Sequence, residues 1–192
     1  MKNFVKSTDK TFGAVTSNKS VNDAVRGGGV FTVTCVDKNG NFKWESKSPN
    51  LVVNIGLQDM NNKYFAGSGY TATWYIGLYG AASSNNPTST DTMASHAGWT
   101  ENTSYSQATR PQATFGAATN ADPSVISNTG SPAVFSINAT TVIGGAFLTT
   151  SNTKGGTAGT LFSAADFQAP GDRSVTNGDT ITVTYQFSLD AV

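Results

Sequence analysis

A run of alternating side chains near the C-terminal end constrains the fold of this chain more than any other feature. Apolar and polar residues alternate from Ile181 to Leu189, so one side of an extended backbone is apolar and the other is polar. Asn177-Gly178-Asp179 supplies a turn immediately before this run. The pattern predicts a strand with one face on a hydrophobic core, formed by Ile181, Val183, Tyr185, Phe187 and Leu189.

Shorter strands are predicted elsewhere, between clusters of glycine, proline and asparagine. The clearest is 29–37, which turns at Asp37-Lys38-Asn39-Gly40 and returns over 41–46, because Asn-Gly supplies the positive φ of a tight hairpin. Further strands are predicted at 72–79, 108–115, 133–140 and 143–150.

One short helix is predicted within 49–67. Leu57, Met60, Tyr64 and Phe65 follow helical spacing, and Gly67 can end the helix. Many short strands with little helix are typical of a sandwich built from antiparallel sheets. The predicted fold class is therefore all-β, an antiparallel β-sandwich or jelly roll with one short helix.

An extended N-terminal arm is predicted to precede this domain. Residues 1–26 are polar and show neither helical nor alternating periodicity. Gly27-Gly28-Gly29 follows, and three glycines give the backbone unusual freedom. These features predict an arm with a glycine hinge at 1–29 and a β-sandwich domain at 30–192.

Charge is sparse and unevenly distributed. Charged residues are 12% of the chain, about half the usual share, which suits packing against neighbours. The net charge of zero argues against wholesale binding to nucleic acid or to an anionic membrane. Residues 1–47 nevertheless hold eight lysines and arginines against four acids. One interpretation is ordinary solvated charge; the other is a basic arm that docks on an acidic neighbour through Lys2, Lys6, Lys10, Lys19 and Arg26.

The sequence predicts a soluble protein made in a cytoplasm. Cys35 is the single cysteine and lies in the apolar run 30–36, so a buried free thiol is expected, without an internal disulfide. No apolar run approaches the roughly eighteen residues of a membrane span. The first ten residues, MKNFVKSTDK, lack the apolar stretch of a signal peptide.

Residues that carry catalysis are few. His96 is the only histidine, and Asp91, His96 and Glu101 are five residues apart, which places them on no common face of a helix or strand. KGGTAGT at 154–160 lacks the Gly-Lys-Ser/Thr ending of a phosphate-binding loop and predicts a turn. No carboxylates have the spacing of a calcium loop. We therefore expect no enzymatic activity, metal site or cofactor.

Three aromatic side chains are candidates for partner binding. Tyr75 and Tyr79 share one face of the predicted strand 72–79, opposite its core-facing side chains. Three interpretations of that face stay open: a protein interface, stacking on a glycan, or a second layer of core. Trp99 follows Gly98 in a long loop and is the best candidate for an exposed anchor.

Six segments of the chain resemble a recurrent family of tailed-bacteriophage virion proteins, often linked to capsid decoration. The resemblance spans about residues 30–189 and is most distinctive across 91–101 and 105–115. The segments are PNLVVNIGLQDM, TWYIGLYG, DTMASHAGWTE, YSQATRPQATFGAA, IGGAFLTT and GDTITVTYQFSL.

This resemblance implies a non-enzymatic capsid decoration (cement) protein that binds the major capsid protein and stabilises the shell. It implies a homodimer or homotrimer on the capsid surface of the virion, made in the host cytoplasm, without direct contact to nucleic acid or membrane. The alternative is a tail-fibre or receptor-binding virion protein, in which the loop 80–104 with Trp99 contacts host glycan.

Overall fold

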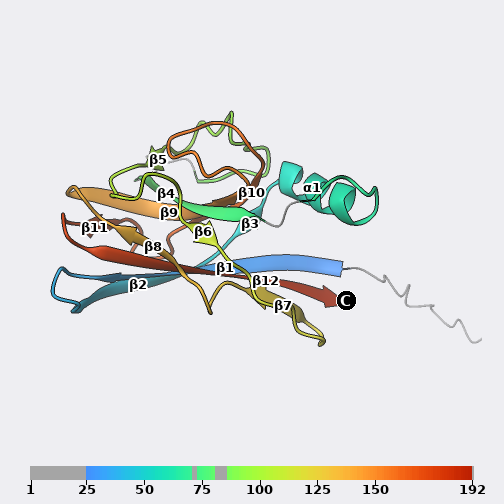
Figure 1. Ribbon diagram of the computed structural model, residues 1–192, viewed down its shortest axis with the longest axis horizontal. Coiled ribbons are helices and arrows are strands. Elements are labelled where there is room, and N and C mark those ends of the chain that lie inside the picture. Colours follow the sequence, from blue (N-terminus) through green and yellow to red (C-terminus); the bar gives the residue numbers. More distant parts are fainter. Residues whose placement is uncertain (1–24, 71–72, 81–85, 192) are drawn as a thin grey trace, which may run out of the picture.

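Two antiparallel sheets packed face to face form the body of the protein (Figure 1). The computed structural model describes residues 25–70, 73–80 and 86–191. One helix, α1 (Asn54–Tyr64), lies at one end of the two sheets. The predicted all-β sandwich with one short helix is confirmed.

The first sheet contains the strand that the alternating pattern predicted. That strand is β12 (Thr180–Ala191), and its long partner is β1 (Val25–Val36). The order is β2-β1-β12-β7, with β8 also paired to β12. The remaining strands of this sheet are β2 (Phe42–Pro49), β7 (Ser124–Ser127) and β8 (Ala133–Ser136).

The second sheet is centred on two long strands, β4 (Trp74–Gly80) and β9 (Thr141–Thr149). Its order is β3-β10-β9-β4-β5, with β11 paired to β9 and β6 paired to β4. The predicted strand 108–115 is wrong in extent, because only Gln112–Ala113 pairs, as β6. The other strands are β3 (Leu51–Val52), β5 (Glu101–Asn102), β10 (Leu161–Asp166) and β11 (Arg173–Val175).

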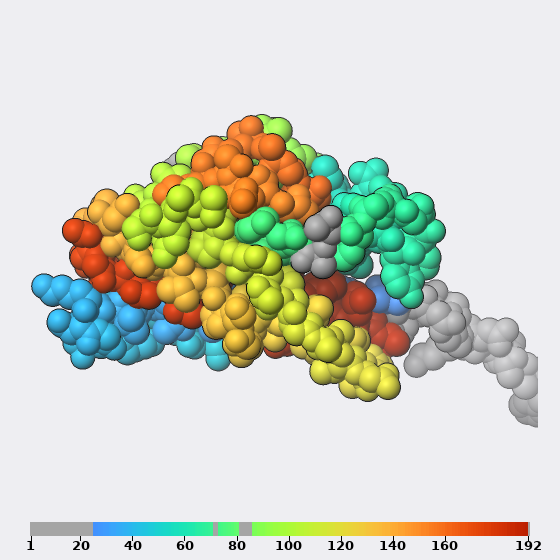
Figure 2. All heavy atoms as spheres, in the orientation of Figure 1, coloured from blue at the N-terminus to red at the C-terminus, as the bar shows by residue number. Residues whose placement is uncertain are grey.

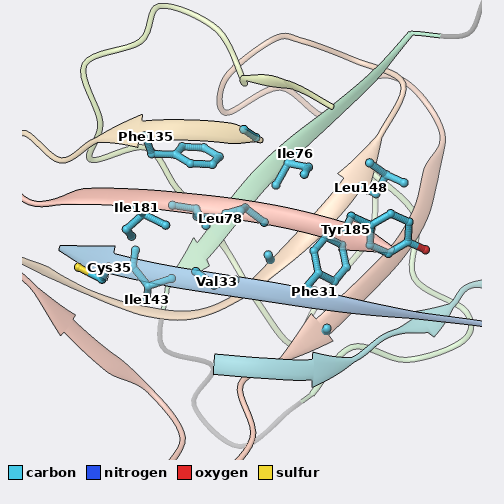
Figure 3. Close-up of a cluster of buried hydrophobic side chains, with 14 of the residues drawn as sticks. Phe31, Val33, Cys35, Ile76, Leu78, Phe135, Ile143, Leu148, Ile181 and Tyr185 are labelled. Atoms are coloured by element: carbon cyan, nitrogen blue, oxygen red, sulfur yellow. The ribbon is translucent and has the colours of Figure 1, made fainter. Parts of the chain in front are cut away.

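The main core lies between the sheets, and its side chains come from both (Figure 3). Ile181, Val183 and Tyr185 of β12 are buried, as the alternation predicted, while Phe187 is half-buried against Phe162 with ring centroids 5.5 Å apart. Among the core side chains are Phe31, Val33 and Cys35 of the first sheet and Ile76, Leu78, Ile143 and Leu148 of the second. Burial raises the pKa of the Cys35 thiol to about 11, so this free cysteine stays protonated at neutral pH.

The predicted glycine hinge is wrong. Gly27-Gly28-Gly29 lies within β1 and pairs with 187–189 of β12, so the sheet begins at Val25 and not at residue 30. A Cβ on Gly29 would lie 2.7 Å from the Tyr185 hydroxyl oxygen and 2.8 Å from the carbonyl oxygen of Gln186. This position therefore requires glycine for the close approach of neighbouring atoms, and not for flexibility.

The part of the chain expected to form the basic arm is described only from residue 25. Arg26 lies on β1 opposite Asp190 and is exposed. Four of the predicted partner-binding residues lie outside the described residues: Lys2, Lys6, Lys10 and Lys19. In the residues that are described, no helix has the length and apolar character needed to cross a membrane.

The turn before β12 forms as predicted, and a buried carboxylate holds it. Asp179 accepts hydrogen bonds from the backbone N–H (2.8 Å) and the hydroxyl (3.1 Å) of Thr176, and Lys43 of β2 pairs with the same carboxylate. Burial alone would raise the pKa of Asp179, but the hydrogen bonds from Lys43 and Thr176 outweigh that effect. The net pKa therefore lies below its usual value.

We expect Asp179→Asn to lower the free energy of unfolding at pH 7 by about 1.5–3 kcal/mol, the usual contribution of hydrogen bonds to a charged group. Because the folded pKa is the lower one, this stabilisation is present above the unfolded pKa of about 3.9 and is lost as the pH falls through the folded value. Urea titrations at a series of pH values should show the difference between wild type and variant shrinking in acid. A difference that stays constant from neutral pH into acid would contradict this assignment.

Candidate interaction surface

The predicted exposed anchor, Trp99, is buried. Its side chain is 4% exposed and packs against Tyr79 (5.3 Å between ring centroids) and Phe147 (5.0 Å) on the outer face of the second sheet. The indole N–H donates to the Asp91 carboxylate at 2.9 Å. The loop that carries Trp99 therefore packs against the outer face of the sheet. The expectation of an exposed anchor is wrong.

The two tyrosines of β4 have different surroundings. Tyr79 is fully buried in this second layer of core and donates a hydrogen bond to Asp166 at 3.1 Å. Burial raises the pKa values of both Tyr79 and Asp166. The interface interpretation is therefore wrong for Tyr79. Tyr75 is half-buried and lines a pocket beside α1.

Asp91, His96 and Glu101 do not form a common site. The Asp91 carboxylate accepts from the backbone and hydroxyl of Thr88 as well as from Trp99. His96 stacks on the Trp99 ring at 3.9 Å, and its Nδ1 lies 2.8 Å from the Trp99 carbonyl oxygen. Each polar group thus has its own structural partner, and these contacts order the loop. Within the described ranges no three His, Cys, Asp or Glu side chains are grouped as metal ligands.

Arg110 is the buried charge that sequence reasoning missed. It is 1% exposed and makes a two-pronged pair with Glu101, with Nε–Oε1 at 2.9 Å and Nη2–Oε2 at 2.6 Å. Its guanidinium also donates to the carbonyl oxygens of Ser151 (2.9 Å) and Gly156 (2.8 Å). Nothing in the sequence around Arg110 distinguishes it from an exposed arginine of a strand, because its partners come from two other parts of the chain, Glu101 and the loop 151–156.

The segment 154–160 is part of a loop, as predicted. Lys154 donates to the carbonyl oxygens of Tyr105 at 2.9 Å and Gln107 at 2.8 Å, and its Nζ lies 4.4 Å from the centre of the Tyr105 ring. This lysine therefore fastens the 150–160 loop to the neighbouring loop. Hydrogen bonds from Lys154 and Arg110 to loop carbonyl oxygens therefore hold together the loops that cover the second sheet.

Three of the exposed apolar side chains lie on or directly after α1. We call Leu57, Tyr64 and Phe65 the helix-end patch; they are 45%, 83% and 79% exposed. The rings of Tyr64 and Phe65 meet edge to face, with centroids 4.8 Å apart. These residues helped to predict the helix, yet they point away from the sheets.

Close packing near the start of α1 holds the helix against the second sheet. A Cβ on Gly56 would lie 2.4 Å from the carbonyl oxygen of Phe162 in β10, so the helix approaches that strand through a glycine. Met60, one turn further along, packs against the main core. The face of α1 that holds Gly56 and Met60 is therefore buried over the first part of the helix, whereas Tyr64 on the same i, i+4, i+8 row is exposed at the end of the helix.

The patch lies at the end of the sandwich where β1 begins and β12 finishes (Figure 1). Figure 2 shows α1 projecting beyond the sheets at this end, above the first residues of β1. Arg26 is on the same end of β1 and is exposed. One end of the molecule thus combines exposed aromatic side chains with the start of β1.

Comparisons of the chain with protein-family models, with curated proteins and with solved structures found no match.

Proposed function

We propose that this chain is a structural protein of a tailed-bacteriophage virion, a capsid decoration protein that binds the major capsid protein and stabilises the shell. The observation that supports this proposal most is the helix-end patch. Tyr64 and Phe65 expose most of their side chains to water on a helix that is otherwise anchored through Gly56. Apolar side chains gathered in this way mark protein-binding surfaces.

The chemistry of the patch suits a protein partner. Aromatic side chains are enriched among the residues that dominate binding energies, and a fixed pair loses little side-chain entropy on binding. The sparse charge of the whole chain lowers the cost of removing water from a large contact area. An apolar, mostly uncharged area on a partner protein would fit this surface.

A second contact is proposed through basic residues in the first 26 residues of the chain. β1 starts at the same end of the sandwich as α1, so a partner bound at the patch would lie close to Val25 and Arg26 (Figure 1). Lys2, Lys6, Lys10, Lys19 and Arg26 would meet an acidic groove on the capsid protein. Two linked contacts reinforce each other, because the second forms within one complex once the first is made.

Capsid stabilisation follows from this binding. A protein that binds the assembled shell, and not separate subunits, shifts the equilibrium toward the shell by mass action. Self-association as a homodimer or homotrimer would link neighbouring capsid subunits further. The proposal requires no catalytic step, cofactor, nucleic-acid contact or membrane contact.

The double variant Tyr64→Ser/Phe65→Ser is expected to bind particles at least tenfold more weakly, since losing about 1.4 kcal/mol of binding energy has that effect and buried aromatic anchors often contribute more. Particles stripped of the protein are incubated with wild type or variant, and bound protein is measured after sedimentation. Re-added wild type should also raise the temperature at which stripped particles rupture.

A matched control is Phe42→Ser, which replaces an aromatic side chain that is 65% exposed on β2 of the first sheet. It should bind like wild type, and circular dichroism should show all three proteins folded. Full occupancy by the double variant would refute the role of the patch. If stripped particles resist heat as well as intact ones but fail to adsorb to host cells, the protein is a receptor-binding component and not a cement.

A further inference from the structure

A pocket of about 340 Å³ lies on the side of α1 opposite the helix-end patch. It is formed where α1 faces the start of β4, the end of β9 and the residue before β10. Its volume is at the lower end of the roughly 300–1,000 Å³ typical of small-molecule sites. The side chains that characterise it are Asp59, Lys63, Tyr70, Tyr75, Thr150 and Thr160.

Two tyrosines provide the aromatic part of this pocket, and neighbouring groups hold one of them in place. The Trp74 indole N–H donates to the Tyr70 hydroxyl at 3.2 Å. Lys63 lies 6.0 Å from the centre of the Tyr70 ring and donates to the carbonyl oxygen of Gly69 at 2.6 Å. Tyr75 is held in the middle of the second sheet between Thr149 of β9 and Gln112 of β6. These contacts orient the Tyr70 ring, and strand pairing on both sides fixes the backbone of Tyr75.

The polar groups of the pocket are balanced in charge and rich in hydroxyls. Asp59 and Lys63 are four residues apart on α1 and supply one negative and one positive charge. Within the part of the chain that the structure describes, the half-buried Asp59 carboxylate makes no hydrogen bond or ion pair. Thr150 Oγ1 accepts from the Thr160 backbone N–H at 2.9 Å, so its own O–H remains a donor.

We propose that this pocket binds a single pyranose ring of a neutral carbohydrate. The flat C–H face of a sugar ring packs on tyrosine, because the face of an aromatic ring is electron-rich. Sugar hydroxyls are both donors and acceptors, which matches the acceptor Asp59, the donor Lys63 and the threonine hydroxyls. With one negative and one positive charge, the pocket has no net charge to attract an anion or a cation, and its many polar groups disfavour hydrocarbon. The proposal concerns a different face of α1 from the patch and does not depend on capsid binding.

Saturation-transfer NMR on the isolated full chain tests the proposal, with methyl glycosides of glucose, galactose, mannose, rhamnose and N-acetylglucosamine as probes. At least one of these glycosides should receive saturation on its ring protons. If two of them bind, adding one in excess should reduce the saturation of the other. Asp59→Asn keeps the shape of the side chain but removes the charge, and it should weaken binding at least tenfold. Tyr75→Ser should weaken binding to a similar extent.

Leu57→Ser is the matched control, because Leu57 belongs to the helix-end patch and does not line the pocket. It should bind sugar like wild type, whereas pocket variants should still decorate particles. The proposal is overturned if none of the five probes binds, if Asp59→Asn and Tyr75→Ser bind like wild type while folded, or if sialylated or sulfated glycans bind better than neutral ones. Failure of sugar binding leaves particle decoration intact, and failure of decoration leaves sugar binding intact, so the two proposals are separable.

Discussion

Replacing Arg110 with alanine is expected to lower the free energy of unfolding by about 3–5 kcal/mol, the usual effect of removing one partner from a buried ion pair. Arg110 is 1% exposed, and the change would leave Glu101 as a buried carboxylate without its cation. The carbonyl oxygens of Ser151 and Gly156 would lose their donor in the same step. Since domains of this size are stable by only about 5–15 kcal/mol, much of the protein should unfold on mild heating.

Urea titration of the Arg110 variant would measure this loss. The double variant Arg110→Met/Glu101→Leu should recover a large part of it, because apolar side chains of similar volume remove both buried charges together. Arg26→Ala changes an exposed arginine and serves as the control. An Arg110→Ala protein that unfolds at the same urea concentration as the Arg26→Ala protein would show that the outer layer is held by its apolar contacts alone.

Gly145→Ala is expected to be the second most damaging change, at or above the roughly 1–3 kcal/mol typical of overpacked cores. Gly145 of β9 lies directly opposite Tyr79 of β4. An added Cβ would lie 2.1 Å from the Tyr79 ring and 2.2 Å from the carbonyl oxygen of Ala165. The ring can move only by leaving the second layer of core, and the carbonyl oxygen belongs to the neighbouring strand β10.

Alanine variants of Gly77 and Gly28 serve as controls for Gly145→Ala. The atoms nearest to a Cβ on Gly77 all belong to the Phe147 ring, the closest at 2.1 Å. Phe147→Leu should therefore partly rescue Gly77→Ala but have no such effect on Gly145→Ala. Gly28 has no atom within 4 Å of its added Cβ, so Gly28→Ala should be neutral or slightly stabilising. Melting temperatures of the alanine variants provide the comparison. Equal stability of the Gly28 and Gly145 variants would mean that the outer layer adapts easily.

The strands with one buried face and one solvent-exposed face were the predictable part of this fold. In β12 the alternation could be read directly, because side chains of a strand point to opposite sides and only one side meets the core. The hairpin of β1 and β2 was equally readable, since Gly40 adopts a positive φ of 83° at the predicted turn. These signals are local, so they survive without knowledge of distant partners.

Strand β10 was missed for the opposite reason. Its residues Leu161–Ala165 are all buried, because the main core lies on one side and the second layer on the other. A strand covered on both faces shows no alternation, and a short Leu-Phe-Ser-Ala-Ala run does not distinguish a strand from a helix. The short strands β3, β5, β7 and β11 were also missed, since two to four residues hold too little pattern.

The sequence alone determined the fold class, the two-sided strands, the turns and the presence of α1, because each depends on side-chain spacing within one segment. Only the tertiary structure decided which aromatic side chains are available to a partner. Trp99 is buried because Asp91, Tyr79 and Phe147 lie next to it in space. Tyr64 and Phe65 are exposed because they lie at the end of α1, where the helix projects beyond the sheets (Figure 2). Exposure is a property of contacts between distant segments, and no single segment of the chain contains that information.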